Sequence, residues 1–150
     1  GEFMLKGIPA IISPDLLKVL DEMGHGDTIV IGDINFPATS LAAAKAHANI
    51  RCDGHRATEI LDGILKLIPL DDFVAKPVKI MDKMEMNSDL SCPVWDEFMQ
   101  IVSKYDKRGA DAVDFMDRFS FYETAQNAYA IVSTTEMASY ACVILQKGCL

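Results

Sequence analysis

Residues 13–33, SPDLLKVLDEMGHGDTIVIGD, contain the features that most directly predict the fold. Ser13 before Pro14 is typical of a helix start, because serine caps free amide groups and proline is tolerated at the first helical position. Apolar side chains follow at helical spacing, at Leu16, Leu17, Leu20 and Met23. Gly24 is then expected to end the helix, and the β-branched run at 28–31 predicts a buried strand.

The rest of the chain continues this alternation of helix and strand. Apolar periodicity or alanine content predicts helices at 41–48, at 57–68, from Pro93 onward and at about 119–128. Short apolar runs predict strands at 78–81, 112–115, 129–132 and 142–145. The polar stretch 82–92 is expected to be a loop, and 45–56 has no regular pattern. Such alternation predicts an α/β fold, a single domain with a central β-sheet and helices packed on it.

Length and composition narrow the possible functions. A chain of 150 residues, half of them apolar, suits one domain with one core. The net charge of −8 argues against nucleic-acid partners and anionic membrane surfaces. No apolar run approaches the roughly 20 residues that span a bilayer, and no secretory signal pattern is present. Residues 1–3, before Met4, are interpreted as a cloning remnant, so the domain is expected to cover 4–150.

The sequence lacks the common motifs for metals, phosphates and nucleophiles. Its four cysteines (52, 92, 142 and 149) form no C-x-x-C pair and have no histidine at ligand spacing, so no metal site is expected. Reduced thiols in the cytoplasm are the favoured interpretation. The stretch GHGD at 24–27 is neither a dinucleotide-binding glycine motif nor a P-loop, and no G-x-S-x-G occurs.

His25 is the strongest candidate for chemistry. It lies between the predicted helix and strand, and loops at sheet ends are where open α/β folds place their sites. Imidazole titrates near neutral pH, which suits a proton shuttle. Asp27 and Asp33 flank the strand, and either could orient the imidazole, while Asp33 could also bind hydroxyl groups of a ligand. The alternatives are a surface histidine without a role and two carboxylates that serve only turns and caps.

Two further residues could contribute to a site. Arg118 comes near the start of a predicted helix, an unfavourable position for a cation, so a role in binding and a surface salt bridge are the two interpretations. Tyr140 precedes the last predicted strand, and its phenol could exchange a proton or pack against a sugar face. Either tyrosine near these positions, Tyr122 or Tyr140, could instead serve packing alone.

Several stretches together resemble one family, in consistent order over residues 4–148. They are MLKGIPAIISPDLLKVLDEMGHGDTIVIGDINFPA at 4–38, IRCDG at 50–54, KLIPLD at 66–71, RFSFYETAQNAYAIV at 118–132 and SYACVILQKG at 139–148. This pattern resembles the RbsD/FucU family of sugar mutarotases. Gly-His-Gly-Asp at 24–27 and the RFSFYE segment are similar to its fucose mutarotase branch, whereas the ribose pyranase branch more often has Gly-His-Thr-Asp.

The resemblance implies an RbsD-like fold and an isomerase that interconverts the α- and β-anomers of L-fucose without a cofactor. A pyranase acting on ribose and a sugar-binding oligomer without catalysis are the alternatives. By matching motifs, His25, Tyr140 and Asp33 take catalytic positions, and Asp33 and Arg118 take sugar-contacting ones. Tyr140, Ala141 and Cys142 stand where the family has Tyr-Gly-Asn or Tyr-Ala-Asn, and sugar contacts are implied for all three.

The resemblance also implies self-association, with each site completed at a subunit contact. A histidine–aspartate pair of one chain and the tyrosine of its neighbour would serve one site, and the sequence leaves open whether Asp27 or Asp33 pairs with His25. Cys142 departs from the family asparagine. A thiol is a weaker and smaller hydrogen-bonding group than an amide, so a side-chain contact there would shift sugar affinity or preference.

Overall fold

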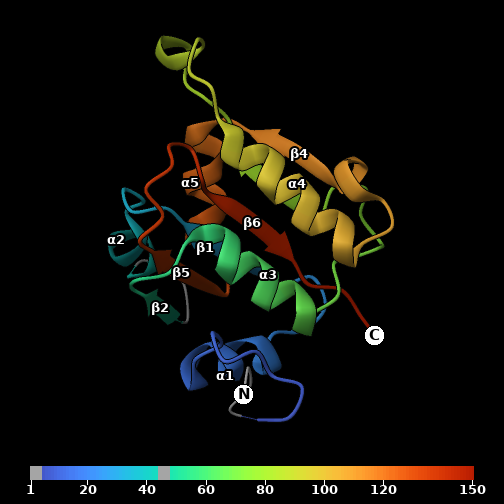
Figure 1. Ribbon diagram of the computed structural model, residues 1–150. Coiled ribbons are helices and arrows are strands. Elements are labelled where there is room, and N and C mark those ends of the chain that lie inside the picture. Colours follow the sequence, from blue (N-terminus) through green and yellow to red (C-terminus); the bar gives the residue numbers. More distant parts are fainter. Residues whose placement is uncertain (1–4, 44–47) are drawn as a thin grey trace.

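The computed structural model describes residues 5–43 and 48–150 (Figure 1). Its helices are α1 (Pro14–Glu22), α2 (Ala38–Ala42), α3 (Ala57–Leu67), α4 (Pro93–Tyr105) and α5 (Arg118–Gln126), with short 3₁₀ turns η1 (Glu85–Asn87) and η2 (Gly109–Ala112). Its strands are β1 (Thr28–Gly32), β2 (Ala48–Cys52), β3 (Val78–Met81), β4 (Val113–Met116), β5 (Ala130–Thr134) and β6 (Val143–Gln146). The strands form one sheet in the order β2-β5-β1-β6-β3-β4.

Strand direction gives the sheet two chemically different edges. β1 pairs in parallel with β5 and antiparallel with β6, and β6 is antiparallel to β3 as well. β2 and β4 run parallel to their neighbours, so five strands point one way and only β6 opposes them. The name carboxyl edge is used here for the side of the sheet where β1, β3 and β4 end and β6 begins. It does not refer to an outermost strand. The amino edge is the opposite one, where β1 begins and β6 ends.

Helices cover both faces of the sheet, which explains why the strands are continuously apolar. Ile29 and Ile31 of β1 pack in a core with α1, α3 and α4, whereas Val30 between them packs in a second core with α2 and α5. Successive strand side chains point to opposite faces, so a strand covered on both sides needs apolar residues at every position. In Figure 1, α3 and α4 run side by side across one face of the sheet.

Most elements predicted from periodicity are confirmed, with ends shifted by a few residues. Ser13 Oγ accepts a hydrogen bond from Leu16 N (3.2 Å) and caps α1, as the Ser-Pro pair predicts. The helix predicted at 41–48 is wrong in its bounds: α2 ends at Ala42, Ala48 already belongs to β2, and 44–47 lie outside the described residues. β2 escaped prediction because a short edge strand that includes an exposed arginine has little apolar pattern. The proposed remnant at 1–3 also lies outside the description.

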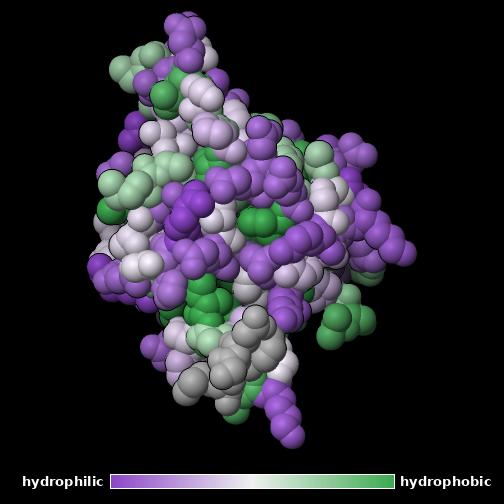
Figure 2. Space-filling view, viewed as in Figure 1, coloured by the Kyte–Doolittle hydropathy of each residue, from purple (hydrophilic) through white to green (hydrophobic). Residues whose placement is uncertain are grey.

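The surface of the described chain is mixed in character. Figure 2 shows hydrophilic side chains over the exposed sides of α3 and α4, with hydrophobic areas small and separated on this face. None of the helices in the described ranges has the length and apolar character needed to cross a bilayer.

The segment between β3 and α4 projects from the body of the molecule at the top of Figure 1.

Candidate active site

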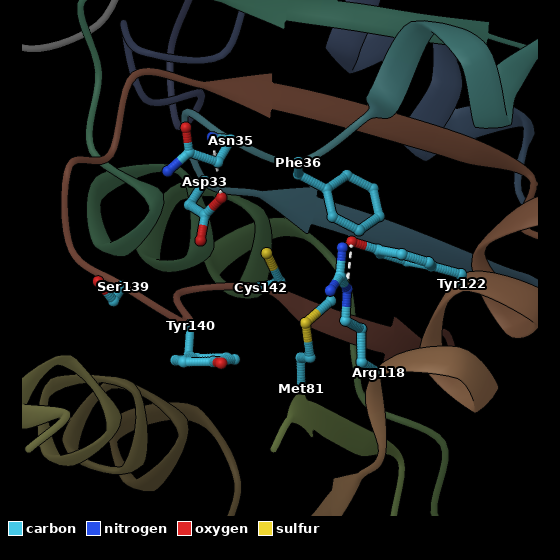
Figure 3. Close-up of a pocket in the computed structure, with 9 residues that line it drawn as sticks. All are labelled: Asp33, Asn35, Phe36, Met81, Arg118, Tyr122, Ser139, Tyr140 and Cys142. Carbon is cyan, nitrogen blue, oxygen red and sulfur yellow. Dashed lines mark hydrogen bonds between the residues drawn. The ribbon is translucent and has the colours of Figure 1, made fainter. Parts of the chain in front are cut away.

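A pocket of about 230 Å³ opens at the carboxyl edge of the sheet (Figure 3). Its lining combines loop residues with residues at the ends of strands: Asp33, Asn35, Phe36, Met81, Arg118, Tyr122, Ser139, Tyr140 and Cys142. The pocket therefore brings together four of the residues selected from sequence, from three separate parts of the chain. Its volume is below the roughly 300–1,000 Å³ of pockets for drug-sized ligands, which favours a smaller one.

Asp33 follows β1 directly and its carboxyl group is buried in the pocket wall. Asp33 is 9% exposed, and its two carboxyl oxygens accept hydrogen bonds from Asn35 N (3.0 Å) and Ala141 N (3.2 Å). Burial raises the pKa of Asp33 above its usual value, against these amides, which favour the charged form. A carboxyl group with a raised pKa can hold and release a proton closer to neutral pH than an exposed one.

Arg118 contributes a cation on the opposite side of the pocket. It is the first residue of α5, and Asp117 caps this helix by accepting from Ser120 N (3.1 Å). Arg118 Nε donates to Tyr122 Oη (2.9 Å), and no carboxylate of the described residues pairs with the guanidinium. The predicted position at a helix start is confirmed, whereas Tyr122, which the sequence favoured only as a packing residue, is part of the pocket.

Tyr140 lines the pocket together with Asp33 and Cys142 (Figure 3), and its backbone conformation is strained. Its φ of 55° lies in the left-handed region, which costs a non-glycine residue about 1–3 kcal/mol and persists only where neighbours hold it. Trp95 Nε1 donates to the Tyr140 carbonyl (2.9 Å). The hydroxyl donates to Asn87 Oδ1 (2.6 Å) and accepts from Met84 N (3.3 Å). Tyr140 is thus held at both its backbone and its phenol.

Cys142 lies in the pocket wall beside Asp33. Burial raises the pKa of its thiol well above the usual value, and the neighbouring Asp33 carboxylate raises it further. The thiol is therefore neutral and acts as a small, weakly polar part of the lining. Figure 3 draws the Cys142 side chain in the pocket lining, so the surface that a ligand meets there is a thiol.

His25 lies at the other end of β1, on the amino edge, and its partner is a residue that the sequence did not suggest. His25 Nε2 is 2.9 Å from Asp71 Oδ1. Neither predicted partner pairs with it. Asp27 accepts from Gly24 N (2.7 Å) and closes the turn between α1 and β1, while Asp33 lies beyond the far end of the strand. The expectation that Asp27 or Asp33 holds the imidazole is therefore wrong.

Asp71 is nearly fully buried and its carboxylate is well satisfied. It accepts from Phe73 N (3.0 Å) and from Gln146 Nε2 (2.9 Å) in addition to His25. These donors, the Phe73 amide foremost, lower the pKa of Asp71 below its usual value. The Phe73 ring meets the imidazole edge-on at 4.7 Å between centroids. Because Asp71 occupies Nε2, a proton transfer by this imidazole would use its other nitrogen, Nδ1.

The two groups of candidate residues are too far apart to act on one small ligand within one chain. The five residues of β1 span about 17 Å at roughly 3.3 Å per residue. His25 precedes the strand and Asp33 follows it. Tyr140 precedes β6, which is antiparallel to β1, so it lies at the same end of β1 as Asp33. The structure thus brings Asp33, Arg118, Tyr140, Ala141 and Cys142 together and leaves His25 apart.

Local sequence reasoning missed several residues that contact these groups. Asp71, Asn87 and Trp95 each contact a candidate residue 45 or more positions away, and Gln146 in turn contacts Asp71. The signal that could have found Asp71 was its place in KLIPLD, one of the stretches that carry the family resemblance. Within the residues that the structure describes, no three His, Cys, Asp or Glu side chains cluster as a metal site would require.

The pocket at the carboxyl edge is small and carries a carboxyl group, a guanidinium and two phenols. These donors and acceptors suit a small ligand rich in hydroxyl groups, so fold and pocket together define an α/β protein with a site of that kind. The sequence matches the RbsD / FucU transport protein family over residues 6–150, and the chain belongs to this family.

Known proteins of closely similar sequence and structure support this membership. The fucose mutarotase of Bos taurus is 42% identical over 149 residues, covering 98% of this chain and 95% of its own. The crystal structure of FucU from Bifidobacterium longum aligns with a TM-score of 0.92 and 48% identity over 97% of this chain and 99% of its own. The fucose mutarotase of Streptococcus pneumoniae in complex with L-fucose aligns with a TM-score of 0.87 and 42% identity, with the same coverage.

Proposed function

We propose that this protein is a fucose mutarotase, an isomerase that interconverts the α- and β-anomers of L-fucose. The observation that carries the proposal is the polar pocket at the carboxyl edge, in a chain whose relatives at above 40% identity are named for this activity. The relatives' names favour fucose over ribose as substrate. The cytoplasmic location expected from the sequence remains part of the proposal.

The reaction needs only proton transfers and a bond rotation. A base removes the proton of the anomeric hydroxyl while an acid protonates the ring oxygen, and the bond between the anomeric carbon and the ring oxygen breaks. The resulting aldehyde turns about its bond to the next carbon, and the ring closes on its other face with the two proton transfers reversed. Two groups that can each give and take a proton suffice for this chemistry, so we expect no cofactor.

The pocket supplies one such group and the means to hold the sugar. Tyr140, with its phenol at the pocket rim, can give a proton to the ring oxygen and take it back. Asp33 accepts hydrogen bonds and Arg118 donates them, so together they can bind several sugar hydroxyls. The raised pKa of Asp33 would also allow its carboxyl group to take part in proton exchange.

The second proton-transfer group is His25 of a neighbouring copy in this proposal. About 17 Å of strand separates His25 from the pocket of its own chain, so only another chain's imidazole could reach the sugar. Its imidazole is supported by Asp71 and its side chain is 35% exposed, which leaves it accessible to a second copy. Each general acid–base group accelerates a reaction roughly 10²–10⁴-fold, so loss of His25 should lower the exchange rate measurably.

Exposed apolar side chains at both edges support association between copies. Phe73, beside His25, is 77% exposed at the amino edge. Phe119 and Met137, close in sequence to Arg118 and Tyr140, are 68% and 75% exposed. Large exposed apolar side chains mark contact surfaces in many soluble proteins. A contact of one chain's amino edge with another's carboxyl edge joins different surfaces, and such contacts close into rings when the rotation permits.

Saturation-transfer NMR on the anomeric protons of L-fucose and D-ribose tests the activity. We expect faster exchange between the α- and β-fucose signals with the protein, lost in His25→Ala. Faster exchange only between pyranose and furanose forms of ribose would replace this proposal with the pyranase alternative. Sugar binding without faster exchange of either sugar would leave a binding protein and overturn the enzyme.

Mixed oligomers test whether the site is shared between copies. His25→Ala and Tyr140→Phe are each expected to keep only a small residual rate, and the two chains are unfolded and refolded together. If His25 and Tyr140 of one site come from different chains, random mixing restores about a quarter of the intact sites and of the activity. Refolding each variant alone is the control. A mixture that stays inactive, or full activity in a monomer, would contradict the shared site.

A further inference from the structure

The polar segment between β3 and α4 touches two of the pocket's functional groups. Residues 82–92 include the η1 turn and project from the body of the molecule in Figure 1. Met84 N donates to Tyr140 Oη (3.3 Å) and Met84 Sδ lies 3.2 Å from Arg118 Nη1. Asn87 Oδ1 accepts from Tyr140 Oη (2.6 Å). A segment predicted only as a loop is thus part of the surroundings of the phenol.

Hydrogen bonds within residues 82–92 fix the position of Asn87. Lys83 Nζ donates to the carbonyl oxygens of Ser88 (3.1 Å) and Leu90 (3.0 Å). The η1 turn adds backbone bonds from Asn87 N to Met84 O (2.8 Å) and from Ser88 N to Glu85 O (3.1 Å). These bonds close the loop around Asn87, so its side chain is held at the phenol rather than free in solvent.

We infer that Asn87 is a positioning residue that supports both protonation states of Tyr140 during sugar ring opening. With the phenol neutral, Asn87 Oδ1 accepts a hydrogen bond from the Tyr140 hydroxyl and so holds the ring, as in the structure. When the hydroxyl turns to the sugar and gives its proton to the ring oxygen, the phenoxide carries the negative charge. A half-turn of the amide then presents Nδ2, which donates to the phenoxide beside the Met84 amide. This inference rests on the proposed function.

The chemistry explains why an amide suits this position better than other side chains. Asparagine carries an acceptor and a donor on one planar group, whereas a carboxylate can only accept. A carboxylate beside a phenoxide would place two negative charges together, which opposes loss of the phenol proton. Asn87 acts through Tyr140 and not on the sugar, because it is absent from the pocket lining.

Two substitutions separate this role from a simple tether. Asn87→Asp keeps the acceptor and loses the donor, and Asn87→Ala loses both. We expect both to lower kcat for fucose anomer exchange roughly 10-fold or more, because each loses a hydrogen bond to a charged group. KM should stay within about twofold of the wild-type value. Ser88→Ala, an exposed neighbour whose side chain has no assigned contact, is the matched control and should keep wild-type kcat. Circular dichroism and thermal unfolding verify the fold of each.

A double-mutant cycle decides whether Asn87 acts through the phenol. In Tyr140→Phe, the further change Asn87→Ala should have no effect on the remaining exchange rate, because no hydroxyl is left to support. Wild-type kcat in Asn87→Asp, or an equal loss from Asn87→Ala with and without the Tyr140 hydroxyl, would overturn the inference while the mutarotase proposal stands. A wild-type protein that does not accelerate exchange would overturn the proposed function, and this inference with it.

Discussion

The imidazole of His25 is held by Asp71, with 2.9 Å between Nε2 and Oδ1, although 46 positions separate the two residues. Asp71 follows α3, and Asp71 N donates to Gln146 O (2.9 Å) at the end of β6. The strand next to β1 thus positions the carboxylate that orients the histidine before β1. The histidine and its partner therefore lie on the amino edge, whereas the pocket around Asp33 lies on the carboxyl edge.

Asp71→Asn should make the protein less stable at neutral pH and less sensitive to acid. The folded pKa of Asp71 is lowered below the unfolded value of 3.8, so the unfolded chain takes up a proton first as the pH falls. The stability that this carboxylate contributes is present above 3.8 and is lost as the pH falls through the folded pKa. Denaturant unfolding between about pH 7 and 2 measures the free energy of unfolding in both proteins.

The control for this comparison is Asp72→Asn, which removes one negative charge from an exposed neighbour. We expect its free energy of unfolding to follow that of the wild type with pH. A loss of stability in acid that is as steep in Asp71→Asn as in the wild type would show that this carboxylate does not stabilise the fold.

Gly32→Ala should distort the pocket from within β1. A Cβ at Gly32 would lie 2.7 Å from Phe36 Cβ, closer than real Cβ atoms approach other heavy atoms, so the Phe36 ring must move. Overpacking of this kind costs about 1–3 kcal/mol, and Phe36 lines the pocket, so KM for fucose should rise as well.

Gly24→Ala is the matched glycine control. A Cβ there meets only Asp27 Oδ2, at an ordinary 3.7 Å. We expect its unfolding midpoint to stay near that of the wild type, and thermal unfolding measures both variants. If Gly32→Ala also kept its midpoint and its KM, the contact with Phe36 would be too soft to shape the pocket.

Arg118→Lys should weaken sugar binding even though the charge is kept. Lysine cannot reproduce the planar fork of donors or the bond from Nε to Tyr122 Oη. We expect KM for fucose to rise roughly 10-fold, the loss of one to two hydrogen bonds to a charged group. Tyr122→Phe, which removes only the anchor of the guanidinium, should have a smaller effect. Arg51→Lys, an exposed arginine paired with Asp53, serves as the control, and a KM equal to its value would rule out a contact between Arg118 and the sugar.

The four thiols should differ in reactivity with iodoacetamide. Cys149 is exposed and should react first, whereas burial raises the pKa of Cys142, Cys52 and Cys92. Cys142 combines nearly complete burial with a carboxylate neighbour, so its thiolate should form least readily. Peptide mass spectrometry at about pH 8 gives the order of modification. Rapid labelling of Cys142 in the folded protein would contradict its buried, neutral state.

Local patterns predicted most of the fold. The Ser-Pro start of α1, the apolar stripe of α3 and the β-branched run of β1 each follow a short-range rule of capping or periodicity, so a single sequence suffices to recognise them. β2 has too weak a pattern to be recognised, because only Ile50 and Cys52 of this edge strand are buried and the rest of its order comes from pairing with β5. The bounds of α2 failed for a similar reason, since alanine content favours a helix without fixing where it ends.

The sequence by itself indicated which side chains have suitable chemistry: an imidazole on a glycine-flanked turn, a carboxylate after a strand, an arginine at a helix start and a tyrosine before β6. Only the tertiary structure decided which of them meet. The antiparallel register of β6 against β1 places Tyr140 at the same edge of the sheet as Asp33, and places Gln146 at the opposite edge, where it donates to Asp71, the partner of His25. Side-chain chemistry is a local property of each residue, whereas proximity depends on strand order and register, which arise from packing across the whole chain.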